Sequence, residues 1–153
     1  MKATPLRVVI DASAGIQLLI EEEHTHAVTA VFARLDGEPP LALHVPDLFF
    51  IECANILLKW TRRTDRPADE SQAHLADLGR LALIAAPTAG LMEDAFSLAS
   101  QTGLTAYDAC YLALAKRLDA VLLTVDADLL ALHPFEGLPV LAPAAFLEGF
   151  MRQ

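Results

Sequence analysis

The stretch Leu104–Leu130, LTAYDACYLALAKRLDAVLLTVDADLL, contains two secondary-structure patterns in immediate succession. Residues 106–118 carry apolar side chains at helical spacing and predict a helix. Residues 121–124 form a short apolar run bounded by polar residues, which predicts a buried strand, and a brief helix is expected from about residue 127. A helix that leads directly into such a strand is typical of a parallel sheet, because the strands of these sheets are buried on both faces.

The same alternation continues outward from this stretch. Further strands are predicted at residues 7–10, 41–45 and 81–85, with an edge strand at residues 139–141. Further helices are predicted from residue 16 and at residues 26–35, 46–63, 69–79, 91–101 and 144–151. Ser13 suits the N-cap position of the first of these helices. Strands alternating with helices predict an α/β protein with a parallel sheet covered on both faces. The length of 153 residues favours a single domain that spans residues 1–153.

Composition limits the kinds of protein that this chain can be. Hydrophobic residues make up 54% of the sequence, which is rich for a monomer and agrees with apolar surface buried in an oligomer. No apolar run reaches the roughly 18 residues that span a bilayer, and the run near the N-terminus is too short for a signal peptide. We therefore expect a cytoplasmic protein that does not enter a membrane. Cys53 and Cys110 form no zinc or redox motif. The net charge of −9 argues against a broad nucleic-acid-binding surface, but it allows a small acidic site that holds cations.

Four carboxylates lie near the predicted edge of the sheet. Asp11 directly follows the first strand, Asp126 follows the strand at 121–124 by two residues, and Glu52 lies in the early turns of the helix after the second strand. Ligands of parallel sheets bind beyond the carboxyl ends of the strands, so this edge is the expected site. Asp108 precedes its strand, and the sheet rule leaves its place open.

Ordinary local structure also explains three of these residues. Asp126 suits the N-cap of the short helix that follows it, and Asp108 completes a shortened capping box that begins at Thr105. Asp11 suits a turn before the Ser13 cap. On local grounds the structural and the functional interpretations of these three residues both stay open.

Glu52 has no capping role, because it lies well inside the helix that contains FFIECANIL, residues 49–57. No Lys or Arg stands three or four residues away from it to form an ion pair within the helix. Asn55 lies three residues later on the same helix face, which favours a polar site. A glutamate that merely faces solvent is the alternative.

Several carboxylates at one edge need a counter-charge. Two of them about 4 Å apart repel by roughly 4 kcal/mol at an effective dielectric constant near 20. Ligands that offer only oxygen suit a hard cation, so Mg²⁺ or Mn²⁺ is expected. Such a cation makes hydroxide accessible near neutral pH and stabilises charge on a phosphodiester oxygen. Ser13 and Thr124 are placed to support this site through water or ligand contacts.

A basic stripe continues along the Glu52 helix. Lys59 and Arg63 project within about 20° of the Glu52 direction, about 10 and 16 Å further along the axis. Together with Arg62 they are candidate contacts to an RNA backbone. Trp60 lies among them and suits either base stacking or apolar packing, and the cations suit an ordinary solvated helix end equally well.

The segments VVIDASA, PDLFFIECANIL and LTAYDACYLALAKRLDAVLLTVDADLL resemble the PIN-domain family, especially the VapC-type toxin ribonucleases. The resemblance covers the chain from Val8 to about Leu130. It rests on four elements in order: an Asp after the first strand, a Glu followed by Asn in a helix, a Tyr-Asp that opens a helix, and a Thr-x-Asp after the next strand. The resemblance implies a three-layer α/β/α sandwich with a parallel sheet of about five strands. It also implies an acidic metal site made by Asp11, Glu52, Asp108 and Asp126, supported by Ser13, Asn55 and Thr124, with Asp128 as an additional outer carboxylate.

The resemblance further implies Mg²⁺- or Mn²⁺-dependent endonucleolytic cleavage of RNA. The enzyme would be the toxin of a toxin–antitoxin pair, a homodimer held inactive by its antitoxin. A PIN-fold module that binds RNA or protein without nuclease activity is the alternative. A haloacid-dehalogenase-like phosphatase needs Asp-x-Asp after its first strand, where this chain has Asp11-Ala12-Ser13. The sequence contains no GxGxxG or P-loop motif, so a nucleotide-cofactor enzyme is not indicated.

Overall fold

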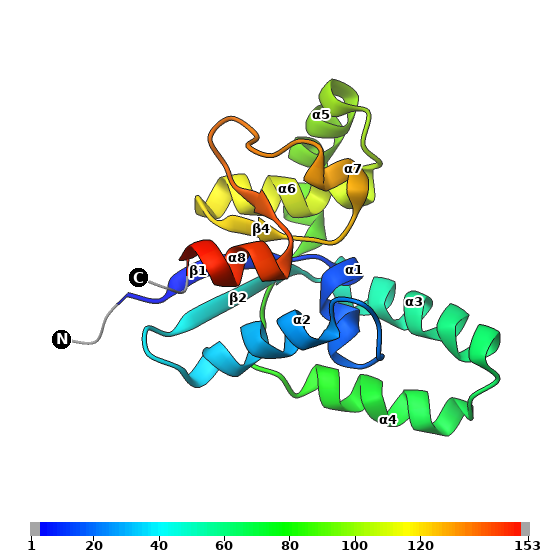
Figure 1. Ribbon diagram of the computed structural model, residues 1–153. Coiled ribbons are helices and arrows are strands. Elements are labelled where there is room, and N and C mark those ends of the chain that lie inside the picture. The colour runs from blue at the N-terminus through cyan, green and yellow to red at the C-terminus, as the bar shows by residue number, and fades with distance from the viewer. Residues whose placement is uncertain (1–3, 151–153) are drawn as a thin grey trace.

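The protein, described for residues 4–150 by a computed structural model, is built around a five-stranded parallel sheet (Figure 1). The strands are β1 (Leu6–Ile10), β2 (Leu41–Pro46), β3 (Ile84–Ala86), β4 (Val121–Leu123) and β5 (Val140–Leu141). They lie in the order β3-β2-β1-β4-β5, and each neighbouring pair is parallel. The predicted α/β fold with a parallel sheet of about five strands is confirmed.

Helices cover both faces of the sheet (Figure 1). On one face α6 (Ala106–Leu118) packs on β1, β2 and β4, and α5 (Met92–Thr102) packs on α6. On the other face α2 (Thr25–Phe32) packs against α8 (Pro143–Phe150). Next to the sheet, α3 (Leu48–Thr64) and α4 (Ala68–Gly79) lie side by side. The remaining short elements are α1 (Ala12–Gly15), α7 (Ala127–Leu130), and the 3₁₀ turns η1 (Ile16–Leu18), η2 (Ala33–Asp36) and η3 (Thr88–Leu91).

The central strands of the sheet are largely buried from solvent, which explains why their sequences are mostly apolar. The last three residues of β1 have no exposed surface, and Leu122 and Leu123 of β4 have none either. In α6 every side chain from Ala109 to Ala115 is buried, because this helix lies between the sheet and α5. The helix is therefore a fixed platform, and any polar group that it carries near the sheet edge is held in place.

Two predicted elements differ from the structure. The helix expected from residue 16 is instead the single turn α1 followed by η1, and Asp11 rather than Ser13 is its N-cap. Asp11 fits because its carboxylate accepts a hydrogen bond from the Ala14 N–H at 3.0 Å. The strand expected at residues 81–85 begins only at Ile84, because Leu81 and Leu83 still form turn hydrogen bonds to Leu78 and Leu81.

The other elements lie within a few residues of their predicted positions. The helix expected at 26–35 is α2 followed by η2, and the edge strand expected at 139–141 is β5. The last helix, expected to reach residue 151, is α8, and residue 151 lies outside the described residues. Within residues 4–150, no helix combines the length and the apolarity that crossing a bilayer requires.

A glycine allows α1 and α3 to approach closely. A Cβ atom added to Gly15 would lie 2.6 Å from the Cε2 atom of the Phe49 ring, which is closer than real Cβ contacts. Phe49 has no exposed surface and lies one turn before Glu52 in α3. The turn that follows Asp11 and the helix that carries Glu52 therefore pack against each other directly.

Candidate active site

Asp11 lies at the carboxyl end of β1 and is only 3% exposed. Its Oδ1 atom accepts hydrogen bonds from the Ala14 N–H at 3.0 Å and the Ser13 hydroxyl at 2.8 Å. Its Oδ2 atom accepts the Thr124 hydroxyl at 2.5 Å, which joins the ends of β1 and β4. Burial raises the pKa of Asp11 from 3.8 to about 6; the three hydrogen bonds oppose the rise, and the nearby Asp108 carboxylate adds to it.

Thr124 also positions Asp126. The Asp126 N–H donates to the Thr124 hydroxyl oxygen at 3.0 Å, and the Asp126 carboxylate accepts from the Leu129 N–H at 3.0 Å as the N-cap of α7. The capping role considered from the sequence is therefore correct. It does not compete with the site, because the same hydrogen bonds fix the carboxylate beside Thr124 at the end of β4.

Glu52 reaches the site from α3, and its hydrogen-bond donor is Tyr111 of α6. The Tyr111 hydroxyl donates to Glu52 Oε1 at 2.5 Å, and Tyr111 itself is 1% exposed. Burial raises the pKa of Glu52, the Tyr111 hydrogen bond opposes that rise, and Asp108 adds to it. Burial and the neighbouring Glu52 keep the pKa of Tyr111 well above its ordinary value of 10, so its hydroxyl stays a donor.

Asp108 is the electrostatic centre of the group. It lies in the first turn of α6, where its N–H donates to the Thr105 hydroxyl oxygen at 3.1 Å. Burial raises the pKa of Asp108, and the Asp126 and Asp128 carboxylates raise it further. Because Asp108 in turn raises the pKa of both Asp11 and Glu52, all four predicted carboxylates interact through it. Asp108, whose place the sheet rule left open, therefore lies within electrostatic range of the other three carboxylates.

The predicted supporting residues fall into two groups. Ser13 and Thr124 contact Asp11, and Ser13 also accepts a hydrogen bond from the Val125 N–H at 3.3 Å. Asn55 and Asp128 are exposed. Asp128 acts on Asp108 through its charge, and Asn55 lies three residues beyond Glu52 on α3.

The chemistry of these side chains suits a hard divalent cation, since every donor is an oxygen atom. Within residues 4–150, no ion pair includes any of the four carboxylates, so their repulsion is not offset by Lys or Arg. In the same part of the chain, no three Asp, Glu, His or Cys side chains stand close enough together to hold one ion as they are now oriented. A shared ion therefore requires side-chain movement, which is open to the half-buried Glu52 and Asp108 but restricted for the hydrogen-bonded Asp11.

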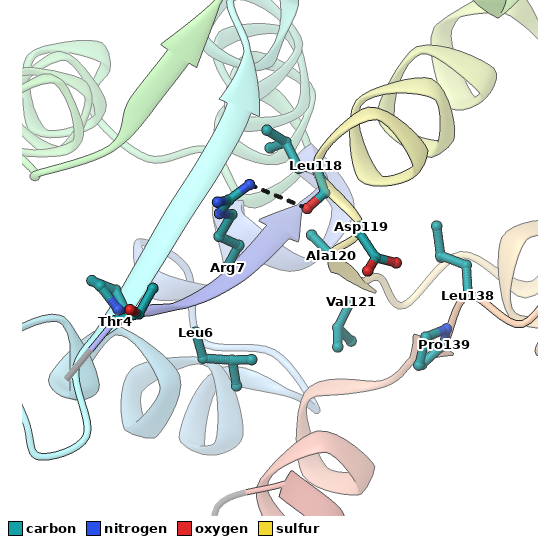
Figure 2. A pocket seen from close by; sticks show the side chains of 10 residues that line it. Thr4, Leu6, Arg7, Leu118, Asp119, Ala120, Val121, Leu138 and Pro139 are labelled. Carbon is teal, nitrogen blue, oxygen red and sulfur yellow. Dashed lines mark hydrogen bonds between the residues drawn. The ribbon is translucent and has the colours of Figure 1, made fainter.

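A hollow of about 570 Å³ lies at the other end of β1 and β4 (Figure 2). It includes the first residues of both strands, and the Arg7 guanidinium there donates to the Leu118 carbonyl at 3.5 Å. None of the four carboxylates lines it. This hollow is therefore not the acidic site. Asp11 and Asp126 lie beyond the opposite, carboxyl ends of the two strands.

The predicted basic residues lie further along α3. Lys59 and Arg62 are exposed, and Arg63 forms an ion pair with Glu22 at 3.4 Å. Trp60 is half-buried, and the Arg66 guanidinium lies 4.9 Å from its ring centroid. The structure therefore places these cations outside the acidic cluster.

Replacing Tyr111 with Phe is expected to lower the activity of the site or its affinity for a divalent cation by about 10- to 100-fold. The change removes only the hydroxyl that orients Glu52 and leaves the buried ring in place. A titration of the variant with Mn²⁺ would measure the affinity, and the rate of the catalysed reaction would measure the activity. Tyr107→Phe is the matched control, since Tyr107 lies on the same helix and is 62% exposed. Equal behaviour of the two variants would remove the positioning role of Tyr111.

Comparison with known proteins shows which proteins this chain is similar to. A family model described as "PIN domain" matches residues 8–133. Ribonuclease VapC3 of Pyrobaculum aerophilum is 35% identical over 131 residues, which are 84% of this chain and 96% of that protein. The crystal structure of PAE2754 from Pyrobaculum aerophilum superposes with a TM-score of 0.67 at 26% identity and covers 98% of this chain and 100% of its own. A toxin–antitoxin complex from Klebsiella pneumoniae contains a chain with the same fold, with a TM-score of 0.61 at 14% identity and coverage of 89% and 97%.

Proposed function

The chain belongs to the PIN-domain family, and from that premise we propose that it is a metal-dependent endoribonuclease, the toxin of a toxin–antitoxin pair. The observation that supports the proposal is that four carboxylates from four elements lie within electrostatic range of one another, with Asp108 acting on or being acted on by each of the other three. A protein keeps such mutually repelling groups together at a cost in stability, and perturbed carboxylates of this kind cluster at functional sites. The substrate class is supported by the VapC3 relative, which is a ribonuclease.

Asp11, Glu52, Asp108 and Asp126 would hold the cation, Mg²⁺ or Mn²⁺. When bound, such a cation lowers the pKa of water and stabilises charge on a phosphodiester oxygen. The other residues orient the carboxylates. Thr124 and Ser13 hold Asp11, and Tyr111 holds Glu52.

Three of the carboxylates accept hydrogen bonds, Asp11 from Thr124, Glu52 from Tyr111 and Asp126 from the start of α7. Thr105 fixes the first turn of α6 and with it Asp108, and the cap of α7 fixes Asp126. These contacts restrict Asp11 most, while the half-buried Glu52 and Asp108 keep the freedom to turn toward a shared cation.

Cleavage of a single-stranded RNA is expected in the presence of Mg²⁺ or Mn²⁺ and is expected to stop when EDTA removes the cation. Electrophoresis of an end-labelled RNA would measure it, with Ca²⁺ as a control because Ca²⁺ prefers more ligands and a looser geometry than Mg²⁺. Binding of RNA without cleavage in Mg²⁺ or Mn²⁺ would instead support the non-nucleolytic PIN module. Cleavage that continues in EDTA would contradict the metal mechanism.

The proposal includes a protein inhibitor and a cytoplasmic location. Two observations support them. The Klebsiella pneumoniae structure that shares this fold is a toxin–antitoxin complex. Cys53 and Cys110 are buried and unpaired with each other, as expected in a reducing compartment. Co-purification from the native host would reveal a small bound protein.

The proposed active form is a homodimer. Met92 and Phe96 on α5 and Tyr107 on α6 are 64%, 75% and 62% exposed, although all three are large and apolar or aromatic. Met92 and Tyr107 also line a mostly apolar hollow of about 160 Å³ together with Leu48. An apolar surface of this kind on a protein with a net charge of −9 is best explained by a second copy that covers it.

Phe96→Glu is therefore expected to convert the dimer into a monomer without unfolding it. The new charge would be buried in the interface, where an unpaired carboxylate costs several kcal/mol. Light scattering coupled to gel filtration would measure the mass, and Gln72→Glu on the exposed face of α4 is the charge-matched control. A Phe96→Glu variant with the mass of the unmodified protein would place the interface elsewhere.

A further inference from the structure

A further hollow, of about 320 Å³, lies beside α3, and none of the four carboxylates lines it. Its walls are Ile20 and Glu22 from the loop after η1, and Ile56, Lys59, Trp60 and Arg63 from α3. It therefore combines an apolar floor with two cations and one carboxylate.

The floor of this hollow is suited to a flat ring. Ile56 and Trp60 are half-buried and pack on the hydrophobic core, and Ile20 is 5% exposed. Aromatic and aliphatic surfaces beside cations bind the bases of single-stranded nucleic acids, because every base offers an apolar face. Bases in a duplex are paired and stacked on one another, so they are not free to enter such a hollow.

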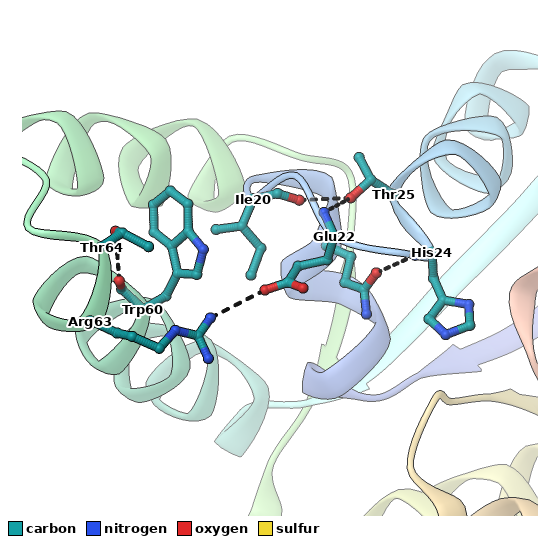
Figure 3. Close-up of polar contacts among 8 residues, drawn as sticks. Ile20, Glu22, His24, Thr25, Trp60, Arg63 and Thr64 are labelled. Atoms are coloured by element: carbon teal, nitrogen blue, oxygen red, sulfur yellow. Dashed lines mark hydrogen bonds and ion pairs between the residues drawn. The ribbon is translucent and has the colours of Figure 1, made fainter.

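The ion pair on the rim is held from the Glu22 side (Figure 3). Arg63 Nη2 lies 3.4 Å from Glu22 Oε1, with the Arg63 side chain 70% exposed and that of Glu22 40% exposed. The Glu22 N–H donates to the Thr25 hydroxyl oxygen at 2.8 Å, and that hydroxyl donates to the Ile20 carbonyl at 2.7 Å. The loop that carries Glu22 is thus fixed, and the longer, more exposed Arg63 is free to change partner.

The hollow is also aligned with the acidic cluster. Lys59 and Arg63 share the helix stripe of Glu52, about 10 and 16 Å along the axis of α3. Four of the eleven Lys and Arg residues lie between residues 59 and 66, in a chain whose net charge is −9. A phosphate backbone that passes Glu52 and follows α3 would therefore meet positive charge at this hollow.

We propose that this hollow binds one nucleotide of single-stranded RNA that flanks the cleaved bond, with the base against Trp60 and Ile56 and the phosphate on Lys59 and Arg63. Glu22 occupies the phosphate position on Arg63 in the free protein, so RNA must displace it. The identity of the polymer rests on the proposed ribonuclease function. The geometry of the hollow supplies two further points: where the nucleotide binds, and that the Glu22 carboxylate competes with its phosphate for Arg63.

The test is binding of a short fluorescein-labelled single-stranded RNA, measured by fluorescence anisotropy in EDTA so that the RNA stays intact. Glu22→Gln should tighten binding by about two- to fivefold, the range that an exposed ion pair allows. Arg63→Gln should weaken binding and lower the slope of log K against log salt by about 0.7 to 1, as loss of one phosphate contact requires. A gain of affinity in Glu22→Gln cannot result from misfolding.

Asp77→Asn and Arg80→Gln are the matched controls, because these residues form another exposed ion pair at 2.9 Å on α4 and the following turn. Both should change RNA affinity less than their counterparts in the hollow. Equal effects of the substitutions in the two ion pairs would overturn the proposal. That outcome is also the one expected if this face binds a protein rather than RNA. The same result with an RNA duplex as with a single strand would also overturn it. Binding is measured without cleavage, so the two proposals can fail separately. A protein that cleaves no RNA but shows the predicted changes in RNA affinity would refute the proposed function and still support this subsite.

Discussion

Glu52→Gln is expected to lower the rate of RNA cleavage by about 100-fold or more, which corresponds to about 2.7 kcal/mol of lost transition-state stabilisation. Loss of groups that merely support a metal ligand already costs about 10- to 100-fold, so loss of the ligand charge should cost at least the upper value. Gln keeps the size of Glu and can still accept the Tyr111 hydroxyl, which in the native protein lies 2.5 Å from Glu52 Oε1. The change is therefore confined to charge.

Single-turnover cleavage at saturating Mg²⁺ would measure this loss, and thermal unfolding would confirm that the variant is folded. Glu38→Gln provides a control in which the same charge is removed from an exposed loop. Unchanged cleavage by Glu52→Gln would show that Glu52 is not part of the active site. A weaker loss that higher Mg²⁺ restores would show that Glu52 acts mainly on cation affinity.

Asp11→Asn is expected to make the protein more stable in EDTA above about pH 6, while it removes activity. The folded-state pKa of Asp11, about 6, lies above its ordinary value of 3.8, so between these values the folded state binds more protons than the unfolded state. Stability then falls as the pH rises through this window, and the ionised carboxylate costs about 3 kcal/mol above it. Asn removes that cost, less about 1 kcal/mol for the changed hydrogen bond with Thr124.

Thermal unfolding in EDTA at several pH values would test this expectation. A gain of about 2 kcal/mol corresponds to a Tm increase of roughly 4 to 8 °C at pH 7.5 for a chain of this size, and the difference should vanish near pH 4. Mg²⁺ should then stabilise the native protein but not the variant, because ligand binding stabilises only a state that binds. Asp36→Asn, at an exposed position, is the control. A variant that is less stable than the native protein at pH 7.5 would contradict the proposed strain at Asp11.

The order of strands and helices was predictable because each element carries its own pattern. Val8, Val9 and Ile10 are a strand in any α/β arrangement that buries both faces, and the buried run of α6 follows from its apolar sequence. The errors arose where the chain turns. Leu81 and Leu83 look like strand residues, yet turn hydrogen bonds that depend on the end of α4 delay the strand to Ile84.

The acidic residues were predictable as a group, whereas their partners were not. Asp11, Glu52 and Asp126 follow strands, so the sheet itself brings them together. Tyr111 was not predicted, because it lies 59 residues from Glu52 and the contact depends on how α3 and α6 pack. The available signal was its place three residues after Asp108, on the same face of α6. From the sequence, Glu52 has no cation nearby in its helix, and a metal ion was the predicted partner. The structure shows a further partner, the Tyr111 hydroxyl, which donates a hydrogen bond to Glu52.

The contact between Gly15 and Phe49 has a consequence for how this protein can vary. Because a methyl group at position 15 would lie 2.6 Å from the Phe49 ring, it would act as a wedge between the β1 turn and α3. The wedge would shift the Glu52 helix relative to Asp11, and it would do so without altering any acidic side chain. Catalytic rate should therefore be tunable from position 15, with a smaller residue at position 49 as the compensating change that restores the spacing.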